Sequence, residues 1–203
     1  MKILKVISVV MFCVVTLMAS TVKTGYEVGD RVDDFKLKNT DGRMVSMADY
    51  KNAKGFIVIF DCNTCPYSKA YNARIIALNK KYAPQNFPVI AINANDPEQS
   101  SGDSFDEMVR EAKSKNYEFP YVVDATQEVA RKFGATNTPH VFVLAKSGNN
   151  LTVSYIGGID DSARNPSAVS KRYVEDAVDA ILAGKPVTTT KTKALGCGIK
   201  WKD

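Results

Sequence analysis

The sequence predicts an α/β domain built around a central sheet with buried strands. Residues 56–60 are five consecutive apolar residues, mostly β-branched or aromatic, and residues 88–94 form a second, mostly apolar run. Such runs are typical of strands that are buried on both faces, as in a parallel sheet. Between the two runs, apolar and aromatic residues recur with the spacing of one face of an α-helix: Tyr67, Tyr71, Ile75, Leu78 and Tyr82.

Two cysteines lie between the first strand and this helix, in the stretch Cys62-Asn63-Thr64-Cys65-Pro66. Proline suits the first turn of a helix, where its missing N–H is no loss. We expect the first cysteine to lie at the helix N-terminus, where unpaired N–H groups and the macrodipole lower the pKa of a thiol. The second would lie one turn further in and be more buried. The pair then forms a reversible dithiol/disulfide couple, which Asp61 could tune with its charge unless that acid faces solvent.

A hairpin is predicted ahead of this strand. Asp41-Gly42 separates two short apolar stretches within residues 28–50, which is a hairpin signal. We interpret this segment as a two-stranded ribbon that is laid on the core domain.

The remaining elements follow from apolar spacing and from turn residues. Ser104 begins a capping-box pattern, Asp124 is suited to cap a short helix, and Gly134 is suited to end it. The predicted helices are 104–116, 129–133 and 174–181, and the predicted extended segments are 119–123, 141–144 and 151–156.

The N-terminus has the layout of a secretory signal peptide. Lys2 and Lys5 precede an apolar run over residues 6–18, and small residues follow. The run is short for a membrane-spanning helix, which needs about 20 residues. We therefore predict a signal peptide over 1–20 and an exported protein, periplasmic or secreted, which contacts the membrane only if the segment is not cleaved.

The rest of the chain is predicted to form one domain with a tail. The domain covers 26–184, and the tail 185–203 lacks periodicity and carries Cys197. Once the leader is removed, three cysteines remain, an odd number for an exported protein. Trp201 could anchor the tail on the domain, so we favour a docked tail.

Charge and histidine content narrow the classes of function. The formal net charge is +5, and loss of Lys2 and Lys5 lowers it by two, so nucleic acid is not an expected partner. The chain has one histidine, His140. A zinc site needs about four nitrogen or sulfur ligands, and only His140, Cys62, Cys65 and Cys197 could supply them. We expect no metal site and no cofactor besides the redox-active disulfide.

Several short motifs carry a resemblance to a known family. Nearly everything after Val28 resembles the thioredoxin-like superfamily, in particular the peroxiredoxin-like branch of the alkyl hydroperoxide reductase/thiol-specific antioxidant (redoxin) family. The resemblance implies a thioredoxin-like fold, with a central mixed sheet flanked by helices, an N-terminal hairpin and a C-terminal tail. The motifs lie at residues 65–71, 95–99, 119–121, 126–130, 158–162 and 196–202.

The resemblance also implies roles for the residues before the strand 141–144. Pro139 would be cis and would face the cysteine pair, and Thr138 and Pro139 would bind the extended chain of a substrate. His140 could carry protons or could be a structural histidine beside a tight turn.

The chain departs from the peroxiredoxin pattern in the residue that orients peroxide. Peroxiredoxins place a threonine or serine three residues before the attacking cysteine. That position holds Cys62 if the cysteine is Cys65, and Ile59 if it is Cys62. Branch relatives often have a cysteine where this chain has Asn137, and many have only the second cysteine of the pair.

Together these features predict a thiol–disulfide oxidoreductase that acts on protein thiols or disulfides, with a redox donor that the sequence does not specify. Cys62 would attack and Cys65 would resolve the mixed disulfide. One alternative is a thiol peroxidase with Cys65 as the peroxide-attacking cysteine, resolved by Cys62 or Cys197. The other is a protein that binds a soft metal through the three cysteines without catalysis. Cys197 itself could resolve, pair with another chain or be structural.

Overall fold

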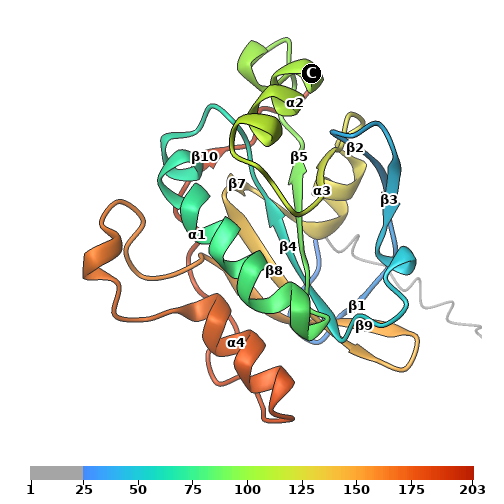
Figure 1. The fold of residues 1–203 in the computed structure, drawn as a ribbon, viewed down its shortest axis with the longest axis vertical. Coiled ribbons are helices and arrows are strands. Elements are labelled where there is room, and N and C mark those ends of the chain that lie inside the picture. Colours follow the sequence, from blue (N-terminus) through green and yellow to red (C-terminus); the bar gives the residue numbers. More distant parts are fainter. Residues whose placement is uncertain (1–24) are drawn as a thin grey trace, which may run out of the picture.

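A computed structural model describes residues 25–203, which fold around one eight-stranded mixed sheet (Figure 1). The strand order is β1-β9-β8-β4-β5-β6-β2-β3, and β7 and β10 form a separate two-stranded sheet. The strands are β1 (Arg31–Val32), β2 (Lys36–Asn39), β3 (Met44–Ser46), β4 (Gly55–Phe60), β5 (Val89–Asn93), β6 (Tyr121–Val123), β7 (Asn137–Thr138), β8 (His140–Ser147), β9 (Asn150–Gly157) and β10 (Cys197–Gly198). The predicted signal peptide, residues 1–20, lies outside the described residues.

The predicted helices are present with slightly different bounds. The α-helices are α1 (Pro66–Tyr82), α2 (Phe105–Ser114), α3 (Glu128–Phe133) and α4 (Tyr173–Leu182), and 3-10 turns cover Met47–Asp49, Ala83–Gln85, Ser101–Asp103 and Pro166–Ala168. Ser104 caps α2 by accepting a hydrogen bond from the Glu107 amide, as its position predicts. Gly134 ends α3 in the left-handed conformation, at φ 72°.

The two apolar runs form the centre of the sheet. β4 and β5 pair in parallel, and every residue of both strands is buried. β8 pairs antiparallel with β4 on its other side, with Phe60 opposite His140. The α/β class and the mixed sheet flanked by helices are therefore confirmed.

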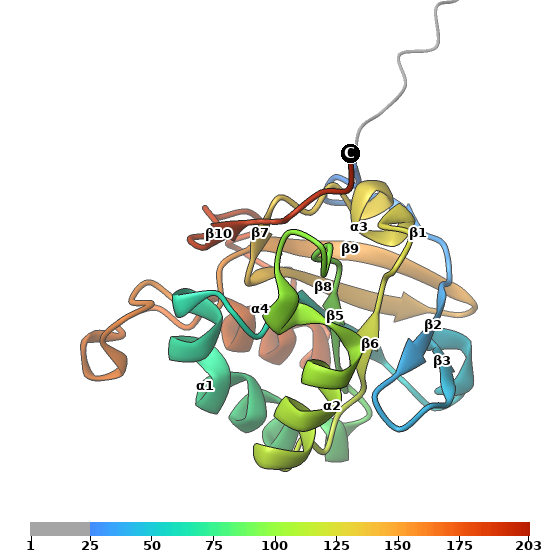
Figure 2. The ribbon, with the colours of Figure 1, turned by 90° about the horizontal axis from the view of Figure 1, so that it is seen from above.

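Helices cover both faces of the sheet and make two apolar cores (Figure 2). One core contains residues of α1, α2 and α4, including Tyr71, Met108 and Val178. The other contains residues of α3 together with Ile199 of the C-terminal segment. The helix face that the sequence predicts in α1 packs into the first core, since Tyr71, Ile75, Leu78 and Tyr82 are buried there.

The N-terminal hairpin is part of the main sheet, which corrects the prediction that it is laid on the core. β2 and β3 pair antiparallel, as the Asp-Gly turn predicts. However, β2 also pairs with β6, and the Asn39 side chain accepts the Tyr121 amide at 2.9 Å. The hairpin therefore continues the hydrogen bonding of a strand edge that would otherwise be open.

Asp124 supports α3 from a position outside the cap. Gln127, in the left-handed conformation at φ 61°, occupies the N-cap position. Asp124 Oδ2 accepts the amide of Ala130, further inside the helix, at 2.8 Å. The predicted Asp124 cap is thus a longer-range contact, because the chain makes an extra turn between Asp124 and the helix.

The C-terminal segment is docked on the domain. The Thr192 amide donates to Ile156 O at 3.0 Å, and the Ile199 amide donates to Thr136 O at 3.1 Å. The Trp201 ring lies against the guanidinium of Arg131, 4.5 Å from ring centroid to Cζ. This agrees with the expectation of a docked tail anchored by tryptophan.

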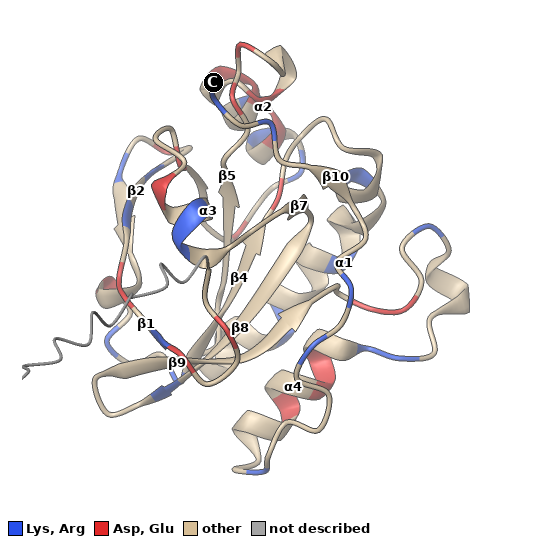
Figure 3. Cartoon of the chain, turned by 180° about the vertical axis from the view of Figure 1, so that it is seen from behind, with Lys and Arg blue, Asp and Glu red and all other residues tan. Residues whose placement is uncertain are grey.

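The charged residues of the described chain are mixed in sign. Figure 3 shows lysine and arginine interspersed with aspartate and glutamate along the chain, on strands, helices and loops alike. Within residues 25–203 no helix combines the length and the apolar character that a bilayer crossing requires.

Candidate active site

The first turn of α1 determines how the two cysteines lie. Pro66 is the first residue of the helix, so Cys65 is its N-cap. Cys62 therefore precedes the helix and is not at its N-terminus. The expectation that the first cysteine would cap the helix and the second would lie one turn inside is wrong, because the proline begins the helix after the pair and not within it.

Both thiols contact the residue that precedes Pro139. Cys62 Sγ lies 3.1 Å from Thr138 Oγ1, and Cys65 Sγ lies 3.1 Å from Thr138 O, to which the thiol form donates. The Thr138–Pro139 peptide bond is cis, as the resemblance implies. Cys62 and Cys65 are buried, with 5% and 2% of their surface exposed. β7 thus places one threonine against both sulfurs.

The surroundings of the two thiols push their pKa values in opposite directions. A hydrogen bond from Cys62 is the main cause that lowers the pKa of Cys65 to about 4, and the Cys197 thiol and the Ser68 and Cys197 amides lower it further against the cost of burial. The same hydrogen bond, together with burial, raises the pKa of Cys62 far above its ordinary value. The surroundings therefore favour negative charge on Cys65 over negative charge on Cys62.

Asp61 is buried next to the pair and is not a solvent-facing acid. Only 5% of its surface is exposed, and its Oδ1 atom is buried without a hydrogen-bond partner among the described residues. Burial raises the pKa of this carboxyl to about 7, partly offset by interactions with the Ser68 side chain and the Cys62 amide. A carboxyl with this pKa can take up or release a proton near neutral pH.

His140 is held in the sheet beside the site. Its Nδ1 accepts the Thr136 amide at 3.3 Å, and its ring lies 4.8 Å from the ring of Phe142. Burial, with a contribution from the charge of Lys191, lowers the pKa of His140 to about 4, so the ring is neutral near pH 7.

The C-terminal segment brings a third cysteine to the pair. β10 pairs antiparallel with β7, and Cys197 is the register partner of Thr138. Its thiol interacts with Cys65, and burial raises the pKa of Cys197 to about 11. All three described cysteines are free. Within residues 25–203, no group of three or more His, Cys, Asp or Glu side chains has the geometry of a metal site.

Asp103 holds the loop between the cysteines through hydrogen bonds, a role that the sequence did not predict. It is 2% exposed and accepts the Asn63 amide at 2.7 Å and the Thr64 hydroxyl at 2.7 Å. Asn93 and Asn95 also donate to it, at 3.2 and 2.9 Å. The only signal in the sequence was its place in a polar loop after the second buried strand.

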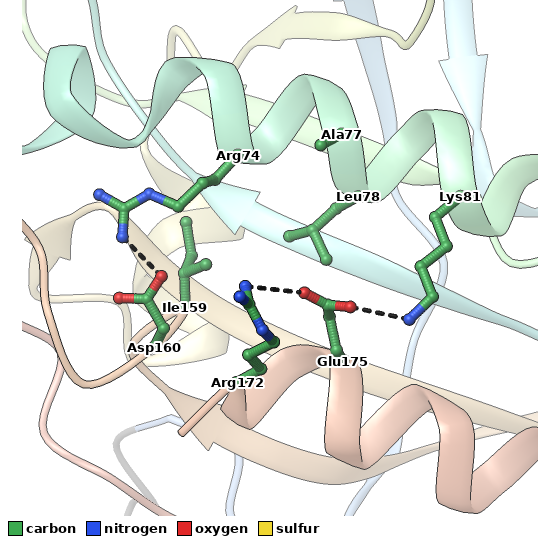
Figure 4. Close-up of a pocket in the computed structure, with 8 residues that line it drawn as sticks. All are labelled: Arg74, Ala77, Leu78, Lys81, Ile159, Asp160, Arg172 and Glu175. Atoms are coloured by element: carbon green, nitrogen blue, oxygen red, sulfur yellow. Dashed lines mark hydrogen bonds and ion pairs between the residues drawn. The ribbon is translucent and has the colours of Figure 1, made fainter. Parts of the chain in front are cut away.

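A separate cavity lies between α1 and α4 and holds no thiol (Figure 4). Its volume is about 130 Å³. On one side Arg74 donates to Asp160 at 2.5 Å, and on the other Glu175 lies between Lys81, at 2.7 Å, and Arg172, at 3.6 Å. The Arg74–Asp160 and Lys81–Glu175 pairs connect α1 to the segment after β9, whereas Arg172 and Glu175 pair within that segment.

The fold resembles that of thioredoxin-like proteins. A putative thiol:disulfide interchange protein DsbE from Chlorobium tepidum superposes with a TM-score of 0.57 over 77% of this chain and 98% of its own, at 20% identity, which supports the shared fold alone. The fold is thus thioredoxin-like, as the resemblance implies.

The family follows from the sequence. The profile of the AhpC/TSA family matches residues 28–151, and this chain belongs to that family. An uncharacterized conserved protein from Geobacillus kaustophilus is 35% identical, with a TM-score of 0.80 over 87% of this chain and 93% of its own. The thiol-disulfide oxidoreductase ResA of Geobacillus thermodenitrificans is 25% identical over 130 residues, 63% of this chain and 69% of that protein.

Proposed function

We propose that this protein is an exported thiol–disulfide oxidoreductase that acts on protein thiols or disulfides through Cys62 and Cys65. The observation that carries the proposal is the position of Cys65 at the N-cap of α1, beside a second thiol. The relative named thiol-disulfide oxidoreductase ResA supports the reaction class. The basic and apolar N-terminal stretch supports export.

In the reductive direction, the Cys65 thiolate attacks one sulfur of a substrate disulfide. A bond forms between Cys65 Sγ and that sulfur, the substrate disulfide breaks, and the other substrate sulfur leaves as a thiolate. We assign the attacking role to Cys65 and not, as the sequence predicts, to Cys62, because Cys65 is the N-cap of α1 and its surroundings favour the charged form.

Cys62 then resolves the mixed disulfide. Its thiol transfers a proton to Asp61, and Cys62 Sγ attacks Cys65 Sγ. The Cys62–Cys65 disulfide forms and the second substrate thiolate leaves, so two protein thiols are oxidised and one substrate disulfide is reduced. Asp61 suits the proton transfer because it is buried beside Cys62 with an oxygen that has no other partner. The oxidising direction is the reverse of these steps.

Thr138 and Pro139 would align the substrate chain, since both thiols contact Thr138. His140 serves as a structural residue in this scheme, because its ring is neutral and its Nδ1 is engaged by the Thr136 amide.

The test compares insulin-disulfide reduction with peroxide consumption for the wild type, Cys62→Ser and Cys65→Ser. We expect Cys65→Ser to abolish insulin reduction, and the double variant Cys62→Ser/Cys197→Ser to stop turnover while still accumulating a mixed disulfide on Cys65. Fast peroxide turnover that survives Cys62→Ser would instead establish the peroxidase alternative. Bound metal in stoichiometric amount, lost in Cys65→Ser, would establish the metal-binding one.

A further inference from the structure

The C-terminal strand lies where an extended peptide would pair beside the thiols. β10 forms antiparallel bridges to β7, with Cys197 opposite Thr138 and Gly198 opposite Asn137. Adding a strand to an exposed edge is a general mode of peptide binding, in which main-chain hydrogen bonds supply affinity. In this protein the edge next to Cys65 is already occupied by the protein's own chain.

Gly196 allows this strand to come unusually close to the site. A Cβ atom at this position would lie 2.3 Å from Thr138 O and 2.7 Å from Thr138 C, distances that backbone atoms cannot accommodate without moving. The neighbouring Gly198 has open space around its Cβ position. The close approach is therefore specific to the residue immediately before Cys197.

The segment is attached on both sides of Cys197. On the N-terminal side, the Thr192 hydroxyl accepts the Gly158 amide at 3.1 Å. On the C-terminal side, Lys200 O accepts the Asp96 amide at 2.9 Å and the Gln127 side chain at 2.8 Å. These contacts hold Cys197 against Cys65, and Cys197 is also the most exposed of the three described cysteines.

We infer that β10 is an internal substrate of the site, which occupies the peptide-pairing edge and presents Cys197 to Cys65 for disulfide exchange. The inference rests on the proposed function, since it uses the oxidised Cys62–Cys65 pair. The Cys197 thiol loses its proton, and its sulfur attacks Cys65 Sγ. The Cys62–Cys65 bond breaks, the Cys65–Cys197 bond forms, and Cys62 leaves as a thiolate that takes up the proton. No electrons enter or leave, so no further oxidant is needed.

The exchange has two consequences. In the Cys65–Cys197 form the strand is fixed across the site, so protein substrates are excluded until the bond is reduced. An external thiolate can also break the Cys65–Cys197 disulfide by attacking Cys197 Sγ, which lies on the C-terminal segment. Cys65 is then the leaving group, and a sulfur with a low pKa leaves more readily.

Tryptic peptides separate the two disulfides. Cys62 and Cys65 share the peptide 55–69, whereas Cys197 lies in the peptide 194–200. The full chain is equilibrated in glutathione buffers of graded ratio, quenched with an alkylating agent and digested without reduction. We expect peptides 55–69 and 194–200 to be found cross-linked by the Cys65–Cys197 disulfide in the wild type. In Cys62→Ser, this cross-linked pair should be the main oxidised species.

Two glycine variants provide a matched control, because both keep all three thiols. Gly196→Ala displaces the strand and should reduce the cross-linked fraction about tenfold, while the disulfide within 55–69 still forms. Gly198→Ala should retain the cross-link. Oxidised Cys65 that accumulates only as its glutathione adduct in Cys62→Ser, with Cys197 free, would overturn the inference while leaving the proposed function intact. If Cys65 stayed unmodified in every buffer, the proposed function itself would fail.

Discussion

Cys65 Sγ lies 3.1 Å from the carbonyl oxygen of Thr138, the residue whose own hydroxyl lies 3.1 Å from Cys62 Sγ. One residue of β7 therefore positions both members of the pair, although it is far from them in the sequence. Because α1 begins at Pro66, the Cys65 sulfur is fixed between the start of the helix and this strand.

The thiolate of Cys65 should depend on its neighbour Cys62. Since a hydrogen bond from Cys62 is the largest cause of the lowered pKa of Cys65, Cys62→Ala should raise that pKa. We expect the rate of Cys65 alkylation by iodoacetamide at pH 5 to fall about tenfold in this variant. Cys197→Ala is the matched control and should have a smaller effect, because Cys197 contributes less than Cys62. Equal rates in the wild type and Cys62→Ala would contradict the prediction.

The buried carboxyl of Asp61 should make stability depend on pH. Burial raises its pKa from 3.8 to about 7 in the folded protein, so folding favours the protonated form. The stabilisation from this protonated form is present below pH 4 and is lost as the pH rises through 7, by up to about 4 kcal/mol.

Replacement of Asp61 by asparagine removes this titration. Asp61→Asn should therefore gain stability relative to the wild type between pH 5 and pH 8, as measured by urea unfolding of both proteins at each pH. If oxidised Asp61→Asn is reduced more slowly than the wild type at pH 7, the role of Asp61 in proton transfer is supported too. A difference in unfolding free energy that does not change with pH would rule out the raised pKa.

Loss of the Asp103 clamp should loosen the loop between the cysteines. Burial alone raises the pKa of Asp103, but hydrogen bonds from Ser100, Asn95 and Thr64 outweigh it, so the pKa is lowered. Asp103→Ala leaves several buried donors without an acceptor and should cost about 2–4 kcal/mol of unfolding free energy. The same variant should change the reduction potential of the pair, measured against glutathione. Asp106→Ala, on the exposed face of α2, is the control and should change neither quantity.

Removing one partner of the ion pair between α1 and the segment after β9 should strongly destabilise the protein. The side chains of Asp160 and Arg74 are 3% and 16% exposed, and Asp160 also accepts the Tyr71 hydroxyl at 3.0 Å. Asp160→Ala leaves Arg74 buried without its partner and should cost about 3–5 kcal/mol in thermal or urea unfolding. Glu107→Ala removes the exposed pair with Arg110 and should cost less than about 1 kcal/mol. Similar losses in both variants would contradict the prediction.

The central strands and the first helix were predictable because the sequence patterns that indicate them each lie within one element. The apolar runs around Ile57 and Ile90 and the spacing from Tyr71 to Tyr82 each lie within one element, and the structure places all of them in the core. The join between the hairpin and β6 was not predictable in this way. It depends on a free strand edge, which no short stretch of sequence reveals.

The candidate site was predictable in its members but not in its geometry. The motif identified Cys62 and Cys65, yet the residue at the helix start depended on where Pro66 falls in the first turn. The burial of Asp61 and the clamp at Asp103 result from tertiary packing. The contact of Cys197 with Cys65 joins the tail to α1, and its only local sign is the glycine before Cys197.

Trp201 is the only tryptophan of the chain, and it is held by Arg131 of α3 near the C-terminus. Fluorescence excited selectively at tryptophan therefore reports whether the C-terminal residues are docked on the domain, and it responds little to changes in the sheet. A fluorescence melting curve of this protein measures release of its end, whereas circular dichroism measures loss of the domain. A fluorescence midpoint below the circular dichroism midpoint would show that the C-terminal residues are released before the domain unfolds.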